Sequence, residues 1–510
     1  MARIVSNQDL DVVGEEEYWV YNGLDCCLTL EIFEEMPFPP YAQVAYNYER
    51  AMQAPVMEMQ LRGWLVNETS RQQAYDVARI KRKRLREIIE KFSQAMADMT
   101  VLAPVAISTT KLKTLLYDKL KLPTKYEINK QTRKRQPSVN REALETLMNY
   151  HYPAPLCRAL LALRDVNKEL ETLGERLTKG RAHSTYNIAG TDTWRFSSSS
   201  DVFGNGTNRQ NIEPTLRRFF VADPGYKLCN IDRSQVESRL VGWWCYVTSG
   251  LTNYLDACEG GDLHTVVASM CWQDLPWTGD LKKDKAIAES PYYRHFTYRD
   301  MSKRGGHASN YMTTPPTMSK HLKLPKKITQ AFQDAYFERF PEIRQWHTWV
   351  AQQLQTIGYI DNSFGFRRFF LGRRYDDTTL RAAVAHLPQS DNAIMTKISL
   401  YHIWNNMPEV QVLHENHDNV LFQYLEEDEP WVVNKAMNLM DVPLEHEGRT
   451  MIIPSDAKVG WMWAEADDLE RAGLAHPDAM ISFEKDQDLG RTRTQAAEPY
   501  RGIFGVPVSS

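Results

Sequence analysis

Two acidic residues far apart in the sequence stand where strands are expected to end. Asp232 follows the apolar run YKLCNI and precedes a helical pattern that begins near Val236. Asp418 lies in the polar turn NHDN between two runs of β-forming residues, which predicts a hairpin. Singly, an Asp at a strand end is most often a cap or turn residue. On adjacent strands, two carboxylates would supply the hard oxygen ligands of a two-magnesium site.

A second pattern lies in the segment YRDMSKRGGHASNYM at 298–312. Arg299, Lys303, His307 and Tyr311 recur every four residues, so an α-helix places them on one face. Two cations, an imidazole and a phenol in this order suit a nucleotide held by its triphosphate. The alternative is an ordinary charged surface helix. The two central glycines favour the nucleotide site, because each costs about 1 kcal/mol of helix propensity and indicates a close backbone approach or a kink.

Length and composition predict an ordinary globular protein with several subdomains. The chain has 510 residues, 43% of them hydrophobic and 25% charged, with a net charge of -4. No apolar run approaches the ~18 residues of a membrane helix, and the N-terminus has no signal-peptide pattern. We therefore expect no membrane association and an intracellular location. The seven cysteines show no zinc-ligand or disulfide spacing.

Two basic stretches precede these candidate sites. Residues 70–95 place apolar side chains at helical spacing between basic ones, which predicts one long amphipathic helix, and a second basic stretch covers 111–138. Composition alone leaves two interpretations open, a solvated face and a surface that contacts nucleic-acid phosphates.

The segment IDRSQVESR at 231–239 resembles the first catalytic motif of family A DNA polymerases, the DNA polymerase I family. Other motifs of that family follow in the same order, and the similarity covers roughly residues 40 to 467. The matching segments are TWRFSSSSDVFGNGTNRQNI at 193–212, GGDLHT at 260–265, the R-x3-K-x7-Y pattern at 299–311, GYIDNSFGFRRFF at 358–370, RAAVAHLPQS at 381–390 and NHDNV at 416–420.

The resemblance implies an α/β (α+β) right-hand fold with a palm sheet and mostly helical thumb and fingers. The implied divisions are a remnant of a 3′–5′ exonuclease domain at 1–40, palm at 41–67 and 186–264, thumb at 68–185, fingers at 265–375, further palm at 376–467, and a C-terminal extension at 468–510 that is either flexible or partner-binding.

The resemblance also implies roles for individual residues. Asp232 and Asp418, with the backbone carbonyl of Arg233, would hold two Mg²⁺ ions, and Lys303 would protonate the leaving pyrophosphate. The implied nucleotide-binding residues are Arg299, Lys303, His264, His307, Tyr311, Gln235 and Glu237, the last of which would exclude a 2′-hydroxyl. The implied contacts to the primer–template are Arg195, Asn208, Gln210, Asn211, Arg381, Gln389 and His417.

Four positions depart from the family pattern. Arg233 replaces the usual Tyr after the first aspartate, where only a backbone oxygen is needed. His307 replaces Phe or Tyr, and Met312 replaces Gly. Asn419 replaces the Glu that usually follows the second aspartate, which removes one negative charge but neither principal ligand. We expect activity to survive, with an altered metal preference.

The N-terminal segment contains one isolated motif. Tyr21 and Asp25 resemble the last motif of the proofreading exonuclease, which needs several further acids. We therefore expect a short amphipathic helix that packs against the polymerase body rather than an active nuclease. A separate polypeptide that completes the nuclease domain is a further hypothesis.

These patterns predict a DNA-directed DNA polymerase that extends a primer with dNTPs in replication or repair, without proofreading in this chain. Its expected partners are a DNA primer–template, dNTPs, and a separate exonuclease polypeptide or replication factor. We expect a phage-type monomer in the cytoplasm of a bacterium or phage-infected host. The alternatives are a polymerase of the same fold that uses rNTPs and a catalytically weakened protein that binds primer–template.

Overall fold

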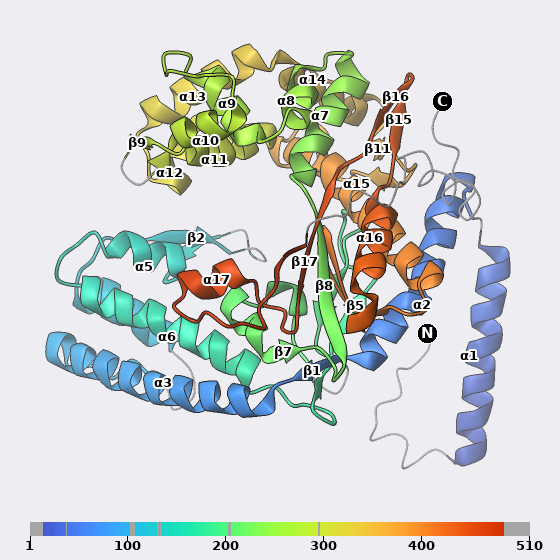
Figure 1. Ribbon diagram of the computed structural model, residues 1–510. Coiled ribbons are helices and arrows are strands. Elements are labelled where there is room, and N and C mark those ends of the chain that lie inside the picture. The colour runs from blue at the N-terminus through green and yellow to red at the C-terminus, as the bar shows by residue number, and fades with distance from the viewer. Residues whose placement is uncertain are drawn as a thin grey trace.

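The computed structural model describes residues 14–36, 38–102, 108–129, 132, 134–201, 204, 206–293 and 296–483. Two groups of helices stand on either side of a deep gap between ribbons, and a central sheet joins them (Figure 1). This is the right-hand arrangement that the sequence predicted. None of the helices in the described ranges is both long and apolar enough to cross a membrane.

The palm sheet has five antiparallel strands in the order β13-β14-β8-β17-β18. Its strands are β8 (Tyr226–Arg233), β13 (Gln411–Asn416), β14 (Asn419–Leu425), β17 (Ser455–Gly460) and β18 (Ile481–Phe483). Helices α2 (Gln43–Arg62), α15 (Asp377–Asn406) and α16 (Glu429–Met440) pack against this sheet. The predicted strand end at Asp232 and the predicted hairpin around Asp418 are both confirmed.

Eight helices form the fingers group above the sheet in Figure 1. They are α7 (Val236–Ser249), α8 (Asn253–Glu259), α9 (Leu263–Cys271), α10 (Leu281–Ala288), α11 (Tyr298–Asn310), α12 (Pro315–Leu322), α13 (Lys326–Arg339) and α14 (Pro341–Thr356). Trp243, Tyr336 and Trp346 are buried in the same apolar core as β8 residues Cys229 and Ile231. The fingers helices and the sheet are therefore one packed body at this junction.

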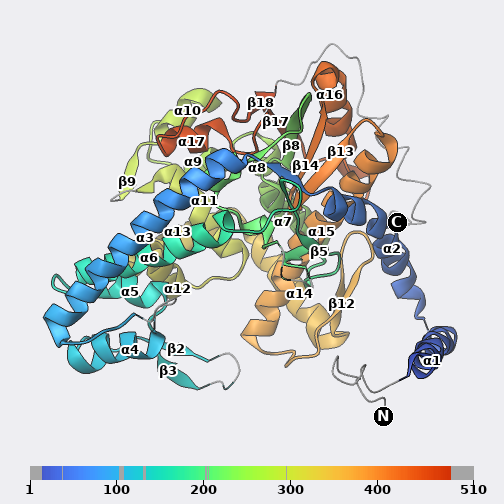
Figure 2. The ribbon, with the colours of Figure 1, turned by 90° about the horizontal axis from the view of Figure 1, so that it is seen from below.

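The group below the gap, which we call the thumb helices, is built on two long helices packed along each other, α3 (Glu68–Ala97) and α6 (Ala154–Leu173). Shorter elements extend this pair: α4 (Thr109–Lys113), α5 (Arg141–Leu147) and the hairpin β2 (Tyr126–Ile128) with β3 (Arg135–Pro137). Figure 2 shows α3 in front of α6 when the molecule is seen from below. Asn67 caps α3 by accepting from the Ser70 N–H, so the predicted long helix is confirmed.

A small sheet joins the thumb helices to the palm. It has the order β4-β1-β7, formed by β1 (Trp64–Val66), β4 (Arg181–Ala182) and β7 (Phe220–Val221). Trp64 packs edge-on against Phe220 and Trp463, and its indole N–H donates to the Leu413 carbonyl at 2.9 Å. This buried indole therefore fixes the start of the thumb to β13.

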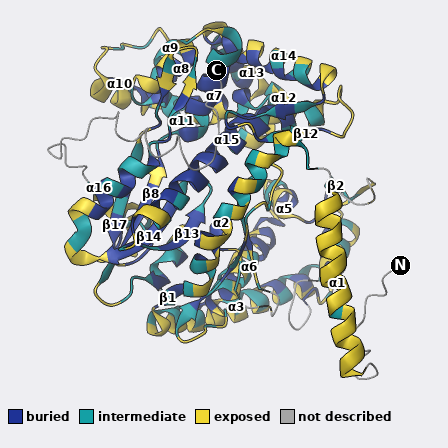
Figure 3. Ribbon diagram, turned by 90° about the vertical axis from the view of Figure 1, so that its right-hand side faces the viewer, coloured by how far each residue is buried: buried dark blue, intermediate teal, exposed yellow. Residues whose placement is uncertain are grey.

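Helix α1 (Glu15–Glu35) does not pack against the body as we expected. None of its residues is buried, and it stands apart from the other helices in Figures 1 and 3. Trp19, Val20, Ile32 and Phe33 are all more than half exposed. Apolar side chains point to several sides of this helix, so it offers no single stripe to the palm, and the expected amphipathic pattern is wrong.

The chain after residue 465 continues into the palm. Helix α17 (Ala466–Arg471) contacts the 3₁₀ turn at Pro214–Phe219, and β18 pairs with β17 at the edge of the palm sheet. Met480 donates its backbone N–H to the Ala464 carbonyl at 2.8 Å. Residues 468–483 are thus part of the folded palm rather than a separate appendage, while the rest of the expected extension lies outside the described residues.

The two central glycines of α11 allow a close helix contact and no kink. A Cβ on Gly305 would lie 2.5 Å from a ring carbon of Phe332 on α13, whereas a Cβ on Gly306 would lie 3.4 Å from the Tyr336 ring. The sequence left two explanations for these glycines, a close backbone approach and a kink, and the close approach is confirmed.

Gly305→Ala is expected to lower stability by about 1–2 kcal/mol, because the overpacking against Phe332 exceeds the gain in helix propensity. Gly306→Ala is the matched control and should be neutral or stabilising by up to about 1 kcal/mol. Thermal and urea unfolding of the two variants measure the difference, and equal effects would contradict the close contact.

Candidate metal and nucleotide site

The end of β8 and the β13–β14 hairpin bring two carboxylates together. Asp232 pairs in register with Asn419, and Asp418 is the adjacent turn residue, whose carbonyl accepts the Arg233 N–H at 3.4 Å. Burial, and then the negative charges of Asp418, Asp456 and Glu465, raise the pKa of Asp232 to about 8. Burial also raises the pKa of Asp418. Holding these groups side by side costs free energy that a bound cation would relieve.

Sequence reasoning missed two acids near this pair. Asp456 lies directly opposite Asp232 on β17, and its carboxylate accepts a hydrogen bond from the Ser234 hydroxyl. Glu465 contributes to the raised pKa of Asp232 from the segment after β17 and forms an ion pair with Lys458. Strand pairing between segments distant in sequence places these acids near Asp232. No local sequence pattern around Asp456 or Glu465 could therefore identify them.

The Arg233 side chain is buried in the palm, where it is 1% exposed. Its guanidinium donates to the Thr396 and Ser399 hydroxyls and the Met395 carbonyl on α15. A fourth hydrogen bond reaches the Met440 carbonyl at the end of α16. This arginine therefore connects the strand that carries Asp232 to two helices, and its charge lowers the pKa of both aspartates.

Helix α11 presents three of the four predicted residues on one face. It begins with a capping box between Thr297 and Asp300. Lys303 is exposed and the His307 side chain is 60% exposed, whereas Tyr311 lies one residue beyond the end of the helix. The predicted shared face is therefore confirmed for Arg299, Lys303 and His307.

Arg299 is engaged by a partner that the sequence did not identify. Its Nε and Nη2 donate to the two oxygens of Asp262 at 2.8 and 2.9 Å. Although burial opposes the shift, hydrogen bonds from Arg299 and Thr265 lower the pKa of Asp262 to about 2. The GGDLHT motif contains Asp262 two residues before His264, which was the available signal.

His264 on α9 lies beside this ion pair. Burial lowers its pKa to about 4, and the charges of Arg299 and Lys303 contribute in the same direction against that of Asp262. The imidazole is therefore neutral at physiological pH and can accept or donate a hydrogen bond at a phosphate oxygen.

Glu237 on α7 connects the palm to the fingers. Arg195 donates to one of its oxygens at 2.8 Å, and the His307 Nδ1 lies 3.8 Å from the other. Burial and then the charge of Glu237 raise the pKa of Tyr311 well above its ordinary value. The structure thus brings Glu237 together with Arg195, His307 and Tyr311.

The predicted DNA contacts differ in accessibility. Asn211 and Arg381 are exposed, Gln389 is partly exposed, and His417 adopts φ 65° in the hairpin turn. Gln210 is only 7% exposed and donates to the Glu415 carboxylate at 3.0 Å. Asn208 accepts from the Ser198 hydroxyl at 3.0 Å. The hydrogen bonds of Gln210 and Asn208 therefore stabilise the loop that carries them. Gln235, a predicted nucleotide contact, lies at the N-cap of α7 with φ 54°.

The donor set suits a hard divalent cation. Mg²⁺ is usually bound by one or two carboxylates together with substrate phosphates, at oxygen ligands only. Asp232 and Asp418 supply two carboxylates, and Glu237, whose charge acts on Asp418, lies 3.8 Å from His307 on α11. The fold and the position of these two carboxylates are those of the right-hand polymerase class.

Comparison with known proteins agrees with this class. The family model described as DNA polymerase family A matches residues 76–465. "DNA polymerase I, thermostable" of Thermus aquaticus is 27% identical over 395 residues, covering 73% of this chain and 44% of that protein. DNA polymerase I of Mycobacterium bovis is 28% identical over 363 residues, covering 66% and 37% respectively.

The fold is similar to that of the POL domain of Pol1 from M. smegmatis, solved in complex with DNA primer–template and dNTP. The TM-score is 0.66 at 21% identity, covering 82% of this chain and 70% of that one. The chain belongs to DNA polymerase family A. It spans less than half the length of these curated relatives.

Arg233→Met should lower the free energy of unfolding by about 3 kcal/mol, because it leaves two hydroxyls and two carbonyls buried without their donor. Arg304→Met on the exposed side of α11 is the control and should change it by less than about 0.5 kcal/mol. Chemical denaturation compares the two variants, and equal stability would show that the four hydrogen bonds contribute nothing.

Proposed function

We propose that this chain is a DNA-directed DNA polymerase that adds dNTPs to the 3′ end of a primer paired with template DNA. The observation that carries the proposal is the pair Asp232 and Asp418 at the palm, linked through Glu237 to the helix α11 that carries Arg299 and Lys303, within a family A fold. The match to proteins described as DNA polymerase I supports the same reaction.

We further propose that Asp232 and Asp418 hold two Mg²⁺ ions, with the Arg233 carbonyl as a further ligand. When bound, these ions would activate the primer 3′-hydroxyl and neutralise charge on the leaving group. The raised pKa values of both aspartates support the assignment, since burial and then neighbouring carboxylates destabilise the charged form of each group until a cation arrives. Asn419 lowers the negative charge of this site by one unit relative to the family pattern.

On this proposal the fingers residues hold the triphosphate. Arg299 exchanges its bidentate contact with Asp262 for phosphate oxygens, and neutral His264 contacts a further oxygen. Lys303 is exposed on the same face, so its ammonium can reach the β–γ phosphates and pass a proton from Nζ to the departing pyrophosphate. Tyr311 and His307 then flank the base and sugar.

Glu237 is proposed to exclude ribonucleotides by occupying the space beneath C2′. Its ion pair with Arg195 and its contact with His307 hold the carboxylate in place, which a steric filter requires. Gln235 at the start of α7 lies in the same nucleotide pocket on this proposal.

Primer–template contacts are proposed for Arg195, Asn208, Asn211, Arg381, Gln389 and His417. Gln210 would need to release Glu415 to take part. We also propose a phage-type monomer acting in bacterial cytoplasm. The domain divisions given under Sequence analysis remain proposals, with residues 468–483 assigned to the palm and helices α7 and α8 grouped with the fingers.

A separate exonuclease polypeptide is a second proposal, supported by α1. Tyr21 and Asp25 interact with each other on this exposed helix, and the Asp25 charge raises the pKa of Tyr21. Addition of a mismatched 3′ end to the extension assay tests it: the purified chain should leave the mismatch intact, whereas removal by this chain alone would contradict the proposal.

Asp232→Ala should reduce primer extension by at least about 10³-fold, because the remaining carboxylate cannot hold the metal ions. Binding of the primer–template, measured by fluorescence anisotropy without metal, should stay within about threefold of wild type. If wild type and variant are equally inert while both bind DNA, the polymerase proposal fails and the chain is a primer–template-binding protein.

Glu237→Ala should raise the ratio of rNTP to dNTP incorporation by about 10-fold or more, because it opens space for a 2′-hydroxyl. Single-nucleotide extension with matched dNTP and rNTP measures the ratio. A wild-type enzyme that already prefers rNTPs would instead support the alternative of a polymerase that makes RNA.

A further inference from the structure

The thumb helix α3 carries a basic surface outside the candidate metal and nucleotide site. Residues 79–86, RIKRKRLR, contain six Lys or Arg in eight positions and no acid. The whole chain has a net charge of -4, so this concentration of positive charge is local.

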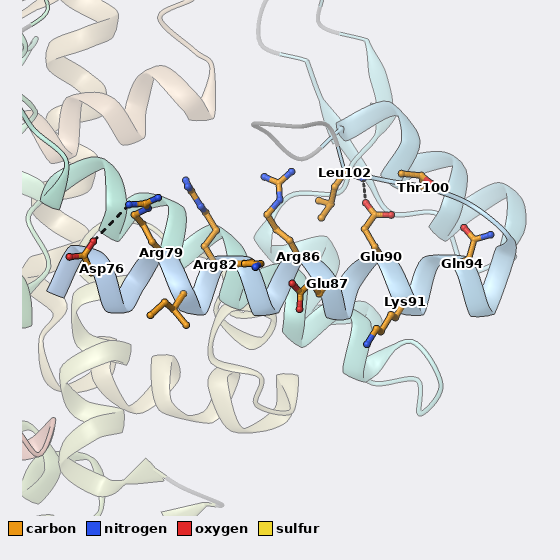
Figure 4. Close-up of a pocket in the computed structure, with 12 residues that line it drawn as sticks. Asp76, Arg79, Arg82, Arg86, Glu87, Glu90, Lys91, Gln94, Thr100 and Leu102 are labelled. Carbon is orange, nitrogen blue, oxygen red and sulfur yellow. Dashed lines mark hydrogen bonds and ion pairs between the residues drawn. The ribbon is translucent and has the colours of Figure 1, made fainter. Parts of the chain in front are cut away.

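A groove of about 1150 Å³ runs along this helix. Figure 4 shows Arg79, Arg82 and Arg86 side by side on one side of α3, at the i, i+3, i+7 positions of one face. Lys83 and Lys91 also line the groove. Its acids are Asp76, Glu87 and Glu90, so cations outnumber carboxylates, and Glu90 already accepts the Leu102 N–H at 2.7 Å.

The groove lies outside the catalytic cleft. Ala78, Ile89 and Ser93 are the buried residues of α3, and they lie on the side that packs along α6. The groove begins beside that packed side, where Arg82 and Arg86 are partly exposed, and extends around α3 to Lys83, Glu87 and Gln94, which are roughly opposite the buried residues on the helical wheel. Figures 1 and 2 place α3 on the side of α6 that is remote from the fingers helices.

The shape and chemistry of the groove fit a nucleic-acid backbone. Arg79 and Arg86 are separated by about 10 Å along the helix axis, which matches about three phosphate steps of one strand of a duplex. Arginine forks bind phosphate oxygens in pairs. Among the described residues that line the groove none is aromatic, so it lacks the stacking platforms that single strands use.

We propose that this groove is a second DNA site, which holds double-stranded DNA outside the cleft through its phosphates and without regard to sequence. Arg79, Arg82 and Arg86 are its principal contacts. The site adds to the proposed polymerase function and needs no catalysis. A polymerase with such a site keeps hold of neighbouring duplex when the primer terminus leaves the cleft.

The test uses the full chain with its cleft occupied by an unlabelled hairpin primer–template. Anisotropy then reports the binding of a labelled blunt duplex of about 20 base pairs at several salt concentrations. The groove variant is R79Q/R82Q/R86Q. The control variant K81Q/R84Q/R158Q removes the same charge from exposed positions that do not line the groove.

The groove variant should bind the second duplex at least about 10-fold more weakly. The plot of log K against log salt should become less steep, with the magnitude of its slope smaller by about 2 to 3. The control should stay within about twofold of wild type, and circular dichroism should show all three chains folded. Equal loss in both variants would overturn the proposal, since net charge rather than the groove would then be responsible. Tighter binding of a single strand than of the duplex would also overturn the proposal, as would an unchanged affinity of the groove variant for the duplex.

Primer extension on a short template separates this inference from the polymerase proposal. The groove variant should keep its wild-type extension rate, because the groove is remote from α11 and the palm aspartates. A parallel loss of extension and primer–template binding would show that the groove belongs to the cleft, against the proposal. If the wild-type chain does not extend a primer, and the groove variant but not the control loses duplex binding, the polymerase proposal is contradicted while the second DNA site is supported.

Discussion

The repulsion between Asp232 and Asp418 is the constraint on which the remainder of the site depends. Backbone register between β8 and β14 forces the two carboxylates together, and Asp456 adds a third charge from β17. Such an arrangement survives only because the surrounding palm is rigid. Arg233 contributes to that rigidity from behind, with four hydrogen bonds to the helices that support the sheet, and its charge partly offsets the repulsion.

The fingers helix α11 carries positive charge, on Arg299 and Lys303, where the palm carries negative charge. The two groups of residues are connected through Glu237. This carboxylate is held by an arginine from the palm and approached by an imidazole from α11. Movement of α11 toward the palm would therefore change the environment of the group that is proposed to sense the sugar. Gly305 allows α11 to lie directly on the Phe332 ring of α13, so that these two helices are positioned together.

Much of the site could be predicted from the sequence because its patterns are local. Asp232 at a strand end, Asp418 in a hairpin turn and the four-residue spacing on α11 each depend on neighbours in the chain. What could not be predicted depends on distant partners. Asp262 pairs with Arg299 across 37 positions, Gln210 turns inward to Glu415, and the β17 register places Asp456. The prediction that α1 packs against the polymerase body was wrong. Helix-forming residues specify that a helix forms but not which surface, if any, covers it.

On the proposed function, the bidentate contact between Arg299 and Asp262 makes the resting protein its own competitor where the triphosphate would bind. Any ligand must displace a carboxylate that already satisfies both prongs of the guanidinium fork. On the proposed function, a triphosphate carries several negative charges against the single charge of this carboxylate and can replace it at the guanidinium. Until then the ion pair holds the Arg299 side chain in one orientation, so the arginine is positioned before the nucleotide arrives.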